Sequence, residues 1–175
     1  MTGPVPTPGQ TIGPFFGFAL AHAGAAELVP PGRADAIRLH GRVLDGAGSP
    51  VPDALVELWQ SDAAGVVVRE PGSLTRDGFT FTGWGRAETD ATGHYSFSTL
   101  EPAAPFFALT VFARGLTNRL FTRAYRPAAA DDPFLATVEA ERRSTLVASA
   151  EESGYRFDIR LQGEGETVFL AYPRH

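Results

Sequence analysis

Short runs of alternating apolar and polar residues, separated by turn sequences, constrain the fold of this 175-residue chain most strongly. Turns rich in glycine, proline and aspartate recur roughly every 10–15 residues, a spacing typical of a β-sandwich or β-barrel. Because side chains alternate across a strand, such runs predict half-buried strands. Strands are expected at 36–44, 54–60, 94–100, 144–149, 155–162 and 166–172, the last two forming a hairpin. We therefore expect an all-β fold, an antiparallel β-sandwich in a single domain spanning residues 1–175.

The first 35 residues differ from the rest because they are rich in proline, glycine and alanine. We expect residues 1–35 to form an irregular N-terminal arm. Its apolar stretch, TIGPFFGFAL at 11–20, indicates that the arm packs on the body of the chain or reaches into a partner. One short helix is predicted at 131–140, where Asp131 or Asp132 would cap the first turn.

Residues 105–126 predict two adjacent strands joined by a turn at 115–118, and the first of them is among the most apolar strands in the sequence. Arg114 ends the first of these strands and is followed directly by a glycine. A guanidinium beside so much apolar surface needs a charged or polar partner. Arg114 is therefore the first candidate for a functional residue.

Composition excludes several kinds of site. The chain has no cysteine, which removes disulfides, zinc–thiolate sites and thiol nucleophiles. All fifteen basic residues are arginine, and without lysine there is no Schiff-base chemistry and no phosphate-loop lysine. The net charge of −5 argues against nucleic acid as the main partner. With no long apolar run and no signal-peptide pattern at the N-terminus, a cytoplasmic protein without membrane contact is expected.

No set of catalytic residues stands out. The four histidines, His22, His40, His94 and His175, are far apart in the sequence, and none belongs to a motif with metal-ligand spacing. Paired carboxylates occur only in polar, turn-like stretches. Taken alone, these residues predict a β-sandwich without an autonomous catalytic site.

Several blocks, in the right order, resemble the intradiol ring-cleaving dioxygenases. They cover nearly the whole chain. The first block and FARG (112–115) resemble the protocatechuate-cleaving members of the family rather than the catechol-specific ones, and the last block resembles the α type of chain. The blocks are TPGQTIGPFF (7–16), GRVLDGAGSPVPDALVELWQSDAAG (41–65), GWGRAETDATGHYSF (83–97), TVFARG (110–115) and YRFDIRLQGEGETVF (155–169). The resemblance implies O2-dependent cleavage of a catechol ring, with a non-haem ferric ion held by two tyrosines and two histidines of the catalytic chain.

The resemblance also implies that this chain has lost the iron ligands. The position of the first tyrosine falls at Val67, and the loop between Leu100 and Pro105, where the second belongs, contains no tyrosine. The two histidine positions fall at Phe106 and Ala108. The side chains of Val67, Phe106 and Ala108 are hydrocarbon and offer no donor atom to Fe(III). We therefore expect this chain to bind no metal, to contain no catalytic residue and to be inactive alone. The Fe(III) would be held by a homologous β partner, and the two chains would form a higher-order (αβ)n oligomer.

By the same resemblance, this chain lines part of the substrate pocket at the subunit interface through Thr11, Gly13, Pro14 and Arg114. The substrate implied is protocatechuate, whose carboxylate a guanidinium would recognise. Other readings remain open: Arg114 forms an ion pair with an acidic residue at the interface, and the other three only shape the subunit contact. The chain could also be a stand-alone β-sandwich that binds carboxylated aromatics, or a structural domain related by fold alone.

Overall fold

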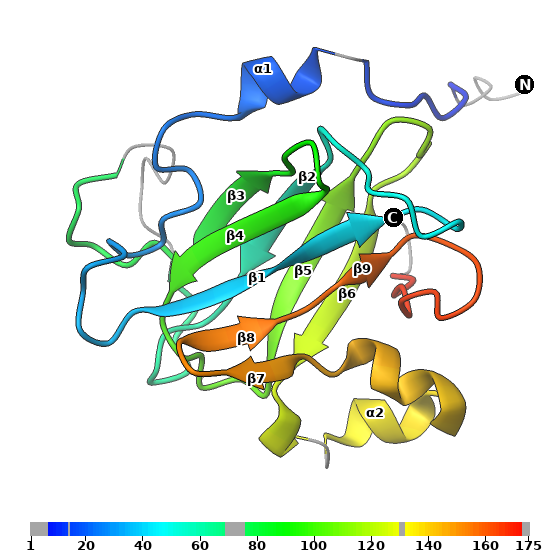
Figure 1. Ribbon diagram of the computed structural model, residues 1–175. Coiled ribbons are helices and arrows are strands. Elements are labelled where there is room, and N and C mark those ends of the chain that lie inside the picture. The colour runs from blue at the N-terminus through cyan, green and yellow to red at the C-terminus, as the bar shows by residue number, and fades with distance from the viewer. Residues whose placement is uncertain (1–6, 14, 69–75, 130–131, 173–175) are drawn as a thin grey trace, which may run out of the picture.

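Two facing β-sheets make up the body of the protein (Figure 1). The computed structural model describes residues 7–13, 15–68, 76–129 and 132–172. The strands are β1 (Ile37–Leu44), β2 (Leu55–Trp59), β3 (Trp84–Glu88), β4 (His94–Thr99), β5 (Phe106–Phe112), β6 (Leu120–Tyr125), β7 (Ser149–Glu151), β8 (Gly154–Arg156) and β9 (Ile159–Arg160). The β-sandwich expected from the sequence is confirmed.

One sheet is antiparallel throughout and the other is mixed. The four-stranded sheet has the order β3-β2-β5-β6. The five-stranded sheet has the order β4-β1-β8-β7, and β9 also pairs with β1. Strands β8 and β9 run parallel to β1, which the hairpin pattern did not predict. Strand β3 was missed because its sequence is glycine-rich; a Cβ at Gly85 would lie 2.4 Å from a methyl carbon of Leu28, so this strand needs glycine for close packing.

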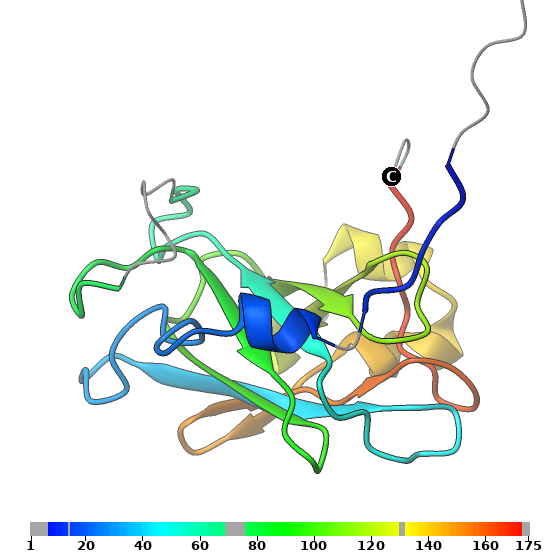
Figure 2. The ribbon, with the colours of Figure 1, turned by 90° about the horizontal axis from the view of Figure 1, so that it is seen from above.

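Short helices lie at both ends of the sandwich. In Figure 1, α1 (Phe16–Leu20) lies above the sheets and α2 (Pro133–Thr137) lies below them. In the view from above, α1 is in front of the sheets (Figure 2). The arm thus contains a helix of its own. Two 3-10 helices follow β6, η1 (Pro127–Ala129) and η2 (Ala140–Leu146). No helix in the described ranges is long and apolar enough to cross a membrane.

The predicted helix at 131–140 is shorter than expected, and it ends at Thr137. Its cap is confirmed at Asp132, whose carboxylate accepts a hydrogen bond from the Phe134 N–H at 2.9 Å. The predicted strand at 144–149 is wrong for its first half, which belongs to η2. There the Thr145 hydroxyl donates to the Arg142 carbonyl at 2.8 Å, a local bond that competes with strand pairing.

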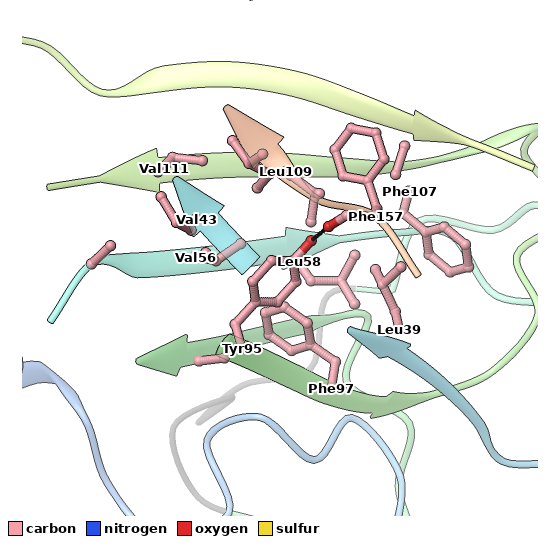
Figure 3. Packing of buried hydrophobic residues seen from close by; sticks show 14 of the residues in the cluster. Leu39, Val43, Val56, Leu58, Tyr95, Phe97, Phe107, Leu109, Val111 and Phe157 are labelled. Atoms are coloured by element: carbon pink, nitrogen blue, oxygen red, sulfur yellow. Dashed lines mark hydrogen bonds between the residues drawn. The ribbon is translucent and has the colours of Figure 1, made fainter. Parts of the chain in front are cut away.

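The main core lies between the two sheets and is built from alternate residues of the facing strands (Figure 3). Leu39, Val43, Val56, Leu58, Tyr95, Phe97, Phe107, Leu109, Val111 and Phe157 are all buried in it. A second cluster forms on the outer face of the four-stranded sheet, where Phe106 and Tyr125 pack against Leu135 of α2 and Leu146 of η2. That part of the outer face is therefore covered, and α2 is held on the sandwich.

The predicted strand at 155–162 is broken at Phe157, and Gly41 of β1 explains the break. The Phe157 N–H donates to the His40 carbonyl at 2.7 Å, and the Phe157 carbonyl accepts from the Tyr95 hydroxyl at 2.6 Å (Figure 3). A Cβ on Gly41 would lie 1.8 Å from that carbonyl oxygen. The chain therefore pivots from β8 to β9 across the one residue of β1 that lacks a side chain. Burial raises the pKa of Tyr95, so its hydroxyl keeps the proton that it donates.

The predicted hairpin between 155–162 and 166–172 is wrong. After β9, Thr167 still bonds to Arg160 through its N–H and its hydroxyl, but no strand ladder continues. Instead Leu170 forms a bridge with Phe121 of β6, in the other sheet. The apolar residues of this segment thus pack across the sandwich rather than beside β9.

Candidate functional site

The N-terminal arm crosses the turn that follows β5. The Thr11 hydroxyl accepts a hydrogen bond from the Gly115 N–H at 2.6 Å, which joins residues 104 positions apart. Gly115 has φ +91, in the left-handed region where glycine is favoured. A Cβ at Gly9 would lie 3.4 Å from the Thr117 carbonyl oxygen, so the arm follows the turn closely. Two residues predicted for the substrate pocket, Thr11 and Arg114, are therefore brought side by side.

Arg114 is paired within the chain. Its Nη2 lies 2.7 Å from Oδ2 of Asp53, and its Nε donates to Oδ1 of the same carboxylate at 3.2 Å. The partner has a simple origin, because Leu55 pairs with Phe112 in the β2–β5 ladder and continuing that register places Asp53 opposite Arg114. The Arg114 side chain is 52% exposed, so it is not buried beside its apolar strand as the sequence suggested.

The other two predicted pocket residues belong to the start of α1. Gly13 is exposed, its carbonyl accepts from the Phe16 N–H at 3.3 Å, and a Cβ at Gly13 would meet open space. Pro14 lies outside the described residues. Thr11 and the Arg114–Asp53 ion pair thus form an open surface, and Gly13 is exposed two residues farther along the arm.

Contacts to the four-stranded sheet anchor the end of α1. Arg86 donates to the Leu20 carbonyl at 3.2 Å and forms an ion pair with Glu57 at 2.6 Å. A Cβ on Gly17 would lie 2.6 Å from a carboxylate oxygen of Glu88, which again indicates close packing. Phe15 is nevertheless 74% exposed. The arm therefore packs on its own chain and still presents an aromatic side chain outward.

The positions that the resemblance assigns to lost iron ligands converge at the other end of β5. Phe106 and Ala108 lie on the outer face of the four-stranded sheet, where the Arg123 guanidinium stacks 4.1 Å from the Phe106 ring. The Ala103 N–H donates to the Asp62 carbonyl at 3.2 Å, which holds loop 100–105 against the turn preceding Val67.

Side chains at these positions are hydrocarbon, and they do not fit a ferric ion. Within the part of the chain that the structure describes, no three or more histidine, aspartate or glutamate side chains are grouped so that they could hold a metal. Ferric iron requires hard anionic oxygen and imidazole donors, which valine, phenylalanine and alanine cannot supply.

An open hollow of about 780 Å3 lies beside Ala108. Trp59, Thr110 and Phe112 line its wall together with Phe121 of β6. Ala108 and Arg114 are six residues apart, which in an extended strand is about 20 Å. The hollow nevertheless extends along β5 to Phe112, two residues before Arg114.

Two histidines that are distant in the sequence meet on the outer face of the five-stranded sheet. His40 Nδ1 lies 3.3 Å from His94 Nε2, and His40 Nε2 lies 2.8 Å from a Glu151 oxygen. The β1–β4 register causes this meeting, since His40 and His94 lie on the same face two positions apart along the ladder. Arg38 also contacts His94, at 3.3 Å. The cluster links β1, β4 and β7, and Arg38 Nε also donates to the Ser96 hydroxyl at 2.9 Å.

Acidification is expected to destabilise the protein through this cluster. Burial, followed by the charges of Arg38 and His40, lowers the pKa of His94 below its ordinary value of 6.5. The unfolded state then binds more protons than the folded state, so stability falls as the pH drops through 6.5. The hydrogen bond from His40 lowers the pKa of Glu151 below 4.5, which adds a loss of the same sign at lower pH.

Urea unfolding midpoints measured between about pH 7.5 and about pH 5.5 test this expectation. His94→Gln should show a shallower decline than the wild-type protein. His22→Gln is the matched control, because the His22 ring is exposed and its Nδ1 lies 3.3 Å from the carbonyl oxygen of the next residue, Ala23. An unchanged slope in His94→Gln would contradict the assignment.

The chain is similar in sequence to known dioxygenases. Residues 19–132 match the family model described as Dioxygenase. The chain is 35% identical over 189 residues to a protocatechuate 3,4-dioxygenase alpha chain from Burkholderia cepacia, covering 94% of this chain and 96% of the relative. It is 36% identical over 151 residues to the beta chain of that name from the same organism, covering 73% of this chain and 64% of the relative.

The fold has solved counterparts. The dioxygenase domain of a dioxygenase carbohydrate-binding protein fusion from Streptomyces sp. SirexAA-E superposes with a TM-score of 0.56 at 24% identity. The superposition covers 91% of this chain and 99% of that domain. At this level of identity the similarity concerns the fold.

Proposed function

Because the chain belongs to the family of intradiol ring-cleaving dioxygenases, we propose that it is the non-catalytic α subunit of a heteromeric protocatechuate 3,4-dioxygenase. The reaction is O2-dependent cleavage of protocatechuate to 3-carboxy-cis,cis-muconate. Both oxygen atoms of O2 enter the product, and the bond between the two hydroxylated carbons breaks. The chain supplies part of the substrate pocket, and a β partner supplies the rest.

The observation that carries this proposal is the likeness to an α chain over nearly the full length of both proteins. Likeness to the beta chain covers less of each protein. The hydrocarbon side chains of Phe106, Ala108 and Val67 offer no donor to Fe(III), which supports the same assignment. Iron held by the β subunit would activate the bound protocatechuate for reaction with O2.

Substrate recognition is assigned to the surface formed by the arm and the end of β5. Arg114 would bind the carboxylate of protocatechuate, because a guanidinium offers planar N–H donors and a fixed positive charge. Thr11 holds the arm against the turn that follows Arg114. Gly13 and Pro14 would form the wall of the pocket by close approach of the backbone.

Expression of this chain alone and together with a β chain tests the proposal. The lone chain is expected to carry no stoichiometric iron and to cleave no protocatechuate. The co-expressed complex should bind iron and consume O2 as protocatechuate disappears. Iron content of the purified proteins and O2 uptake are the two measurements.

Three outcomes would contradict the proposal. Iron or ring cleavage in the lone chain would make this chain catalytic. Full activity and wild-type KM of the β chain without this chain would instead favour a structural role based on shared fold. Binding of protocatechuate by the lone chain without turnover would favour a stand-alone binding module.

A further inference from the structure

We propose that Asp53 is a positioning residue for substrate recognition, because its carboxylate fixes the plane of the Arg114 guanidinium and leaves one donor edge for the substrate. This inference rests on the proposed function, in which Arg114 binds the carboxylate of protocatechuate. Nothing in the sequence patterns singled out Asp53.

The geometry of the ion pair defines which donors remain. Asp53 takes the side-on edge of the guanidinium, with Oδ1 at 3.2 Å from Nε and Oδ2 at 2.7 Å from Nη2. A guanidinium has five N–H donors in a planar fork, so the end-on edge formed by Nη1 and Nη2 stays available. No described residue accepts a hydrogen bond from Nη1. That edge matches a second carboxylate with two parallel N–H···O bonds.

The backbone of Asp53 is held in an unusual conformation. Its φ is 56°, and it is the one non-glycine residue with positive φ among those the structure describes. The Asp53 N–H donates to the Thr89 carbonyl at 3.2 Å, and the Thr89 hydroxyl accepts from the Ala54 N–H at 2.8 Å. Thr89 is buried, so this turn is fixed by interior contacts. Strained residues of this kind persist where the surrounding structure over-determines them, and they cluster at functional sites.

The side chain of Asp53 also differs from other aspartates in turns. Asp45, Asp62, Asp77 and Asp90 each accept hydrogen bonds from backbone N–H groups of their own turn. Asp53 instead directs both oxygens at a guanidinium 61 residues away. Its carboxylate is therefore not needed to close the turn that contains it.

Pairing with Asp53 has an electrostatic consequence for selectivity. The neutral pair attracts anions in general less strongly than a lone guanidinium would. Binding then depends on how well an anion fits the two aligned donors of the end-on edge. Asp53 thus favours a planar carboxylate at a defined position, as on an aromatic ring, over other anions.

The test uses Asp53→Asn in the αβ complex, because asparagine is similar in shape and tolerates positive φ. KM for protocatechuate is expected to rise about three- to tenfold, because the loss of guanidinium alignment outweighs the stronger general attraction of an unpaired guanidinium for anions. The kcat should stay within about twofold of wild type. Catechol lacks the carboxylate, so its KM, or its Ki as an inhibitor, should stay unchanged. Adding Asp53→Asn to Arg114→Ala should cause no further change, because the residue acts through Arg114.

Asp35→Asn is the matched control, since Asp35 forms a similar two-bond pair with Arg33 on the exposed surface. It should leave both KM values unchanged. A lower or unchanged KM for protocatechuate in Asp53→Asn would overturn the positioning role. An equal loss for catechol, or a further loss in the double variant, would assign Asp53 to structure instead. If Arg114→Ala alone has a selective effect and Asp53→Asn has none, this inference fails while the proposed function stands.

Discussion

Arg114→Ala in the αβ complex is expected to raise KM for protocatechuate roughly 10- to 150-fold. This corresponds to a loss of about 1.5–3 kcal/mol of binding free energy, the range for a hydrogen bond to a charged group. The reason is that the substrate carboxylate would lose a charged, planar donor pair. The effect on catechol should be much smaller. Steady-state kinetics with both substrates separate recognition of the carboxylate from general damage to the pocket.

Arg33→Ala provides the control for loss of one positive charge, because Arg33 also pairs with an aspartate on the exposed surface. Its KM values should match those of the wild-type complex. Equal losses for protocatechuate and catechol in Arg114→Ala would assign Arg114 to the subunit contact. The amount of complex recovered by size-exclusion chromatography should therefore be measured alongside the kinetics.

Gly41→Ala is expected to destabilise the fold by more than about 3 kcal/mol, beyond the usual cost of an overpacked site. The added methyl carbon would lie 1.8 Å from the Phe157 carbonyl oxygen, which is backbone and accepts from the buried Tyr95 hydroxyl. Relief of this clash requires β8 or β9 to leave β1. Denaturant unfolding of the purified chain should show a large fall in midpoint, or the variant should fail to fold.

The matched control is Gly32→Ala, because a Cβ at Gly32 meets nothing within 4 Å. Its stability should stay within about 0.5 kcal/mol of wild type, as for most surface substitutions. A Gly41→Ala variant as stable as Gly32→Ala would show that the pivot at Phe157 is not required. Together the two variants separate the effect of this position from the general effect of replacing glycine.

The alternation of apolar and polar residues predicted those strands that bury one face in the core. It failed where tertiary contacts determine which segment a strand pairs with. Strands β1, β2, β4, β5 and β6 appear close to their predicted bounds because one face of each packs on the core. Segment 166–172 carries the same alternation but crosses to β6, a choice of partner that local pattern does not encode. Strand β3 lacks the pattern because Gly85 replaces a side chain with close backbone packing.

The candidate site was predicted in part. Arg114 was found because a charge ended an apolar strand, but its exposure and its pairing with Asp53 depend on the β2–β5 register. Once the β2–β5 register is known, counting along the two strands places Asp53 opposite Arg114. The ion pair could therefore be predicted from the sequence only after the strand pairing had been established. The contact between Thr11 and Gly115 spans 104 positions, and nothing local predicts it.

The bond between the Thr11 hydroxyl and the Gly115 N–H has a consequence for assembly order. It ties the arm to the backbone unit next to Arg114, so the docking of the arm and the placement of the guanidinium are mechanically linked. Because the β partner supplies the rest of the proposed pocket, the complete pocket would form only when the two chains join. Free subunits would then compete poorly for substrate, and the concentration of assembled complex would set how much protocatechuate is captured.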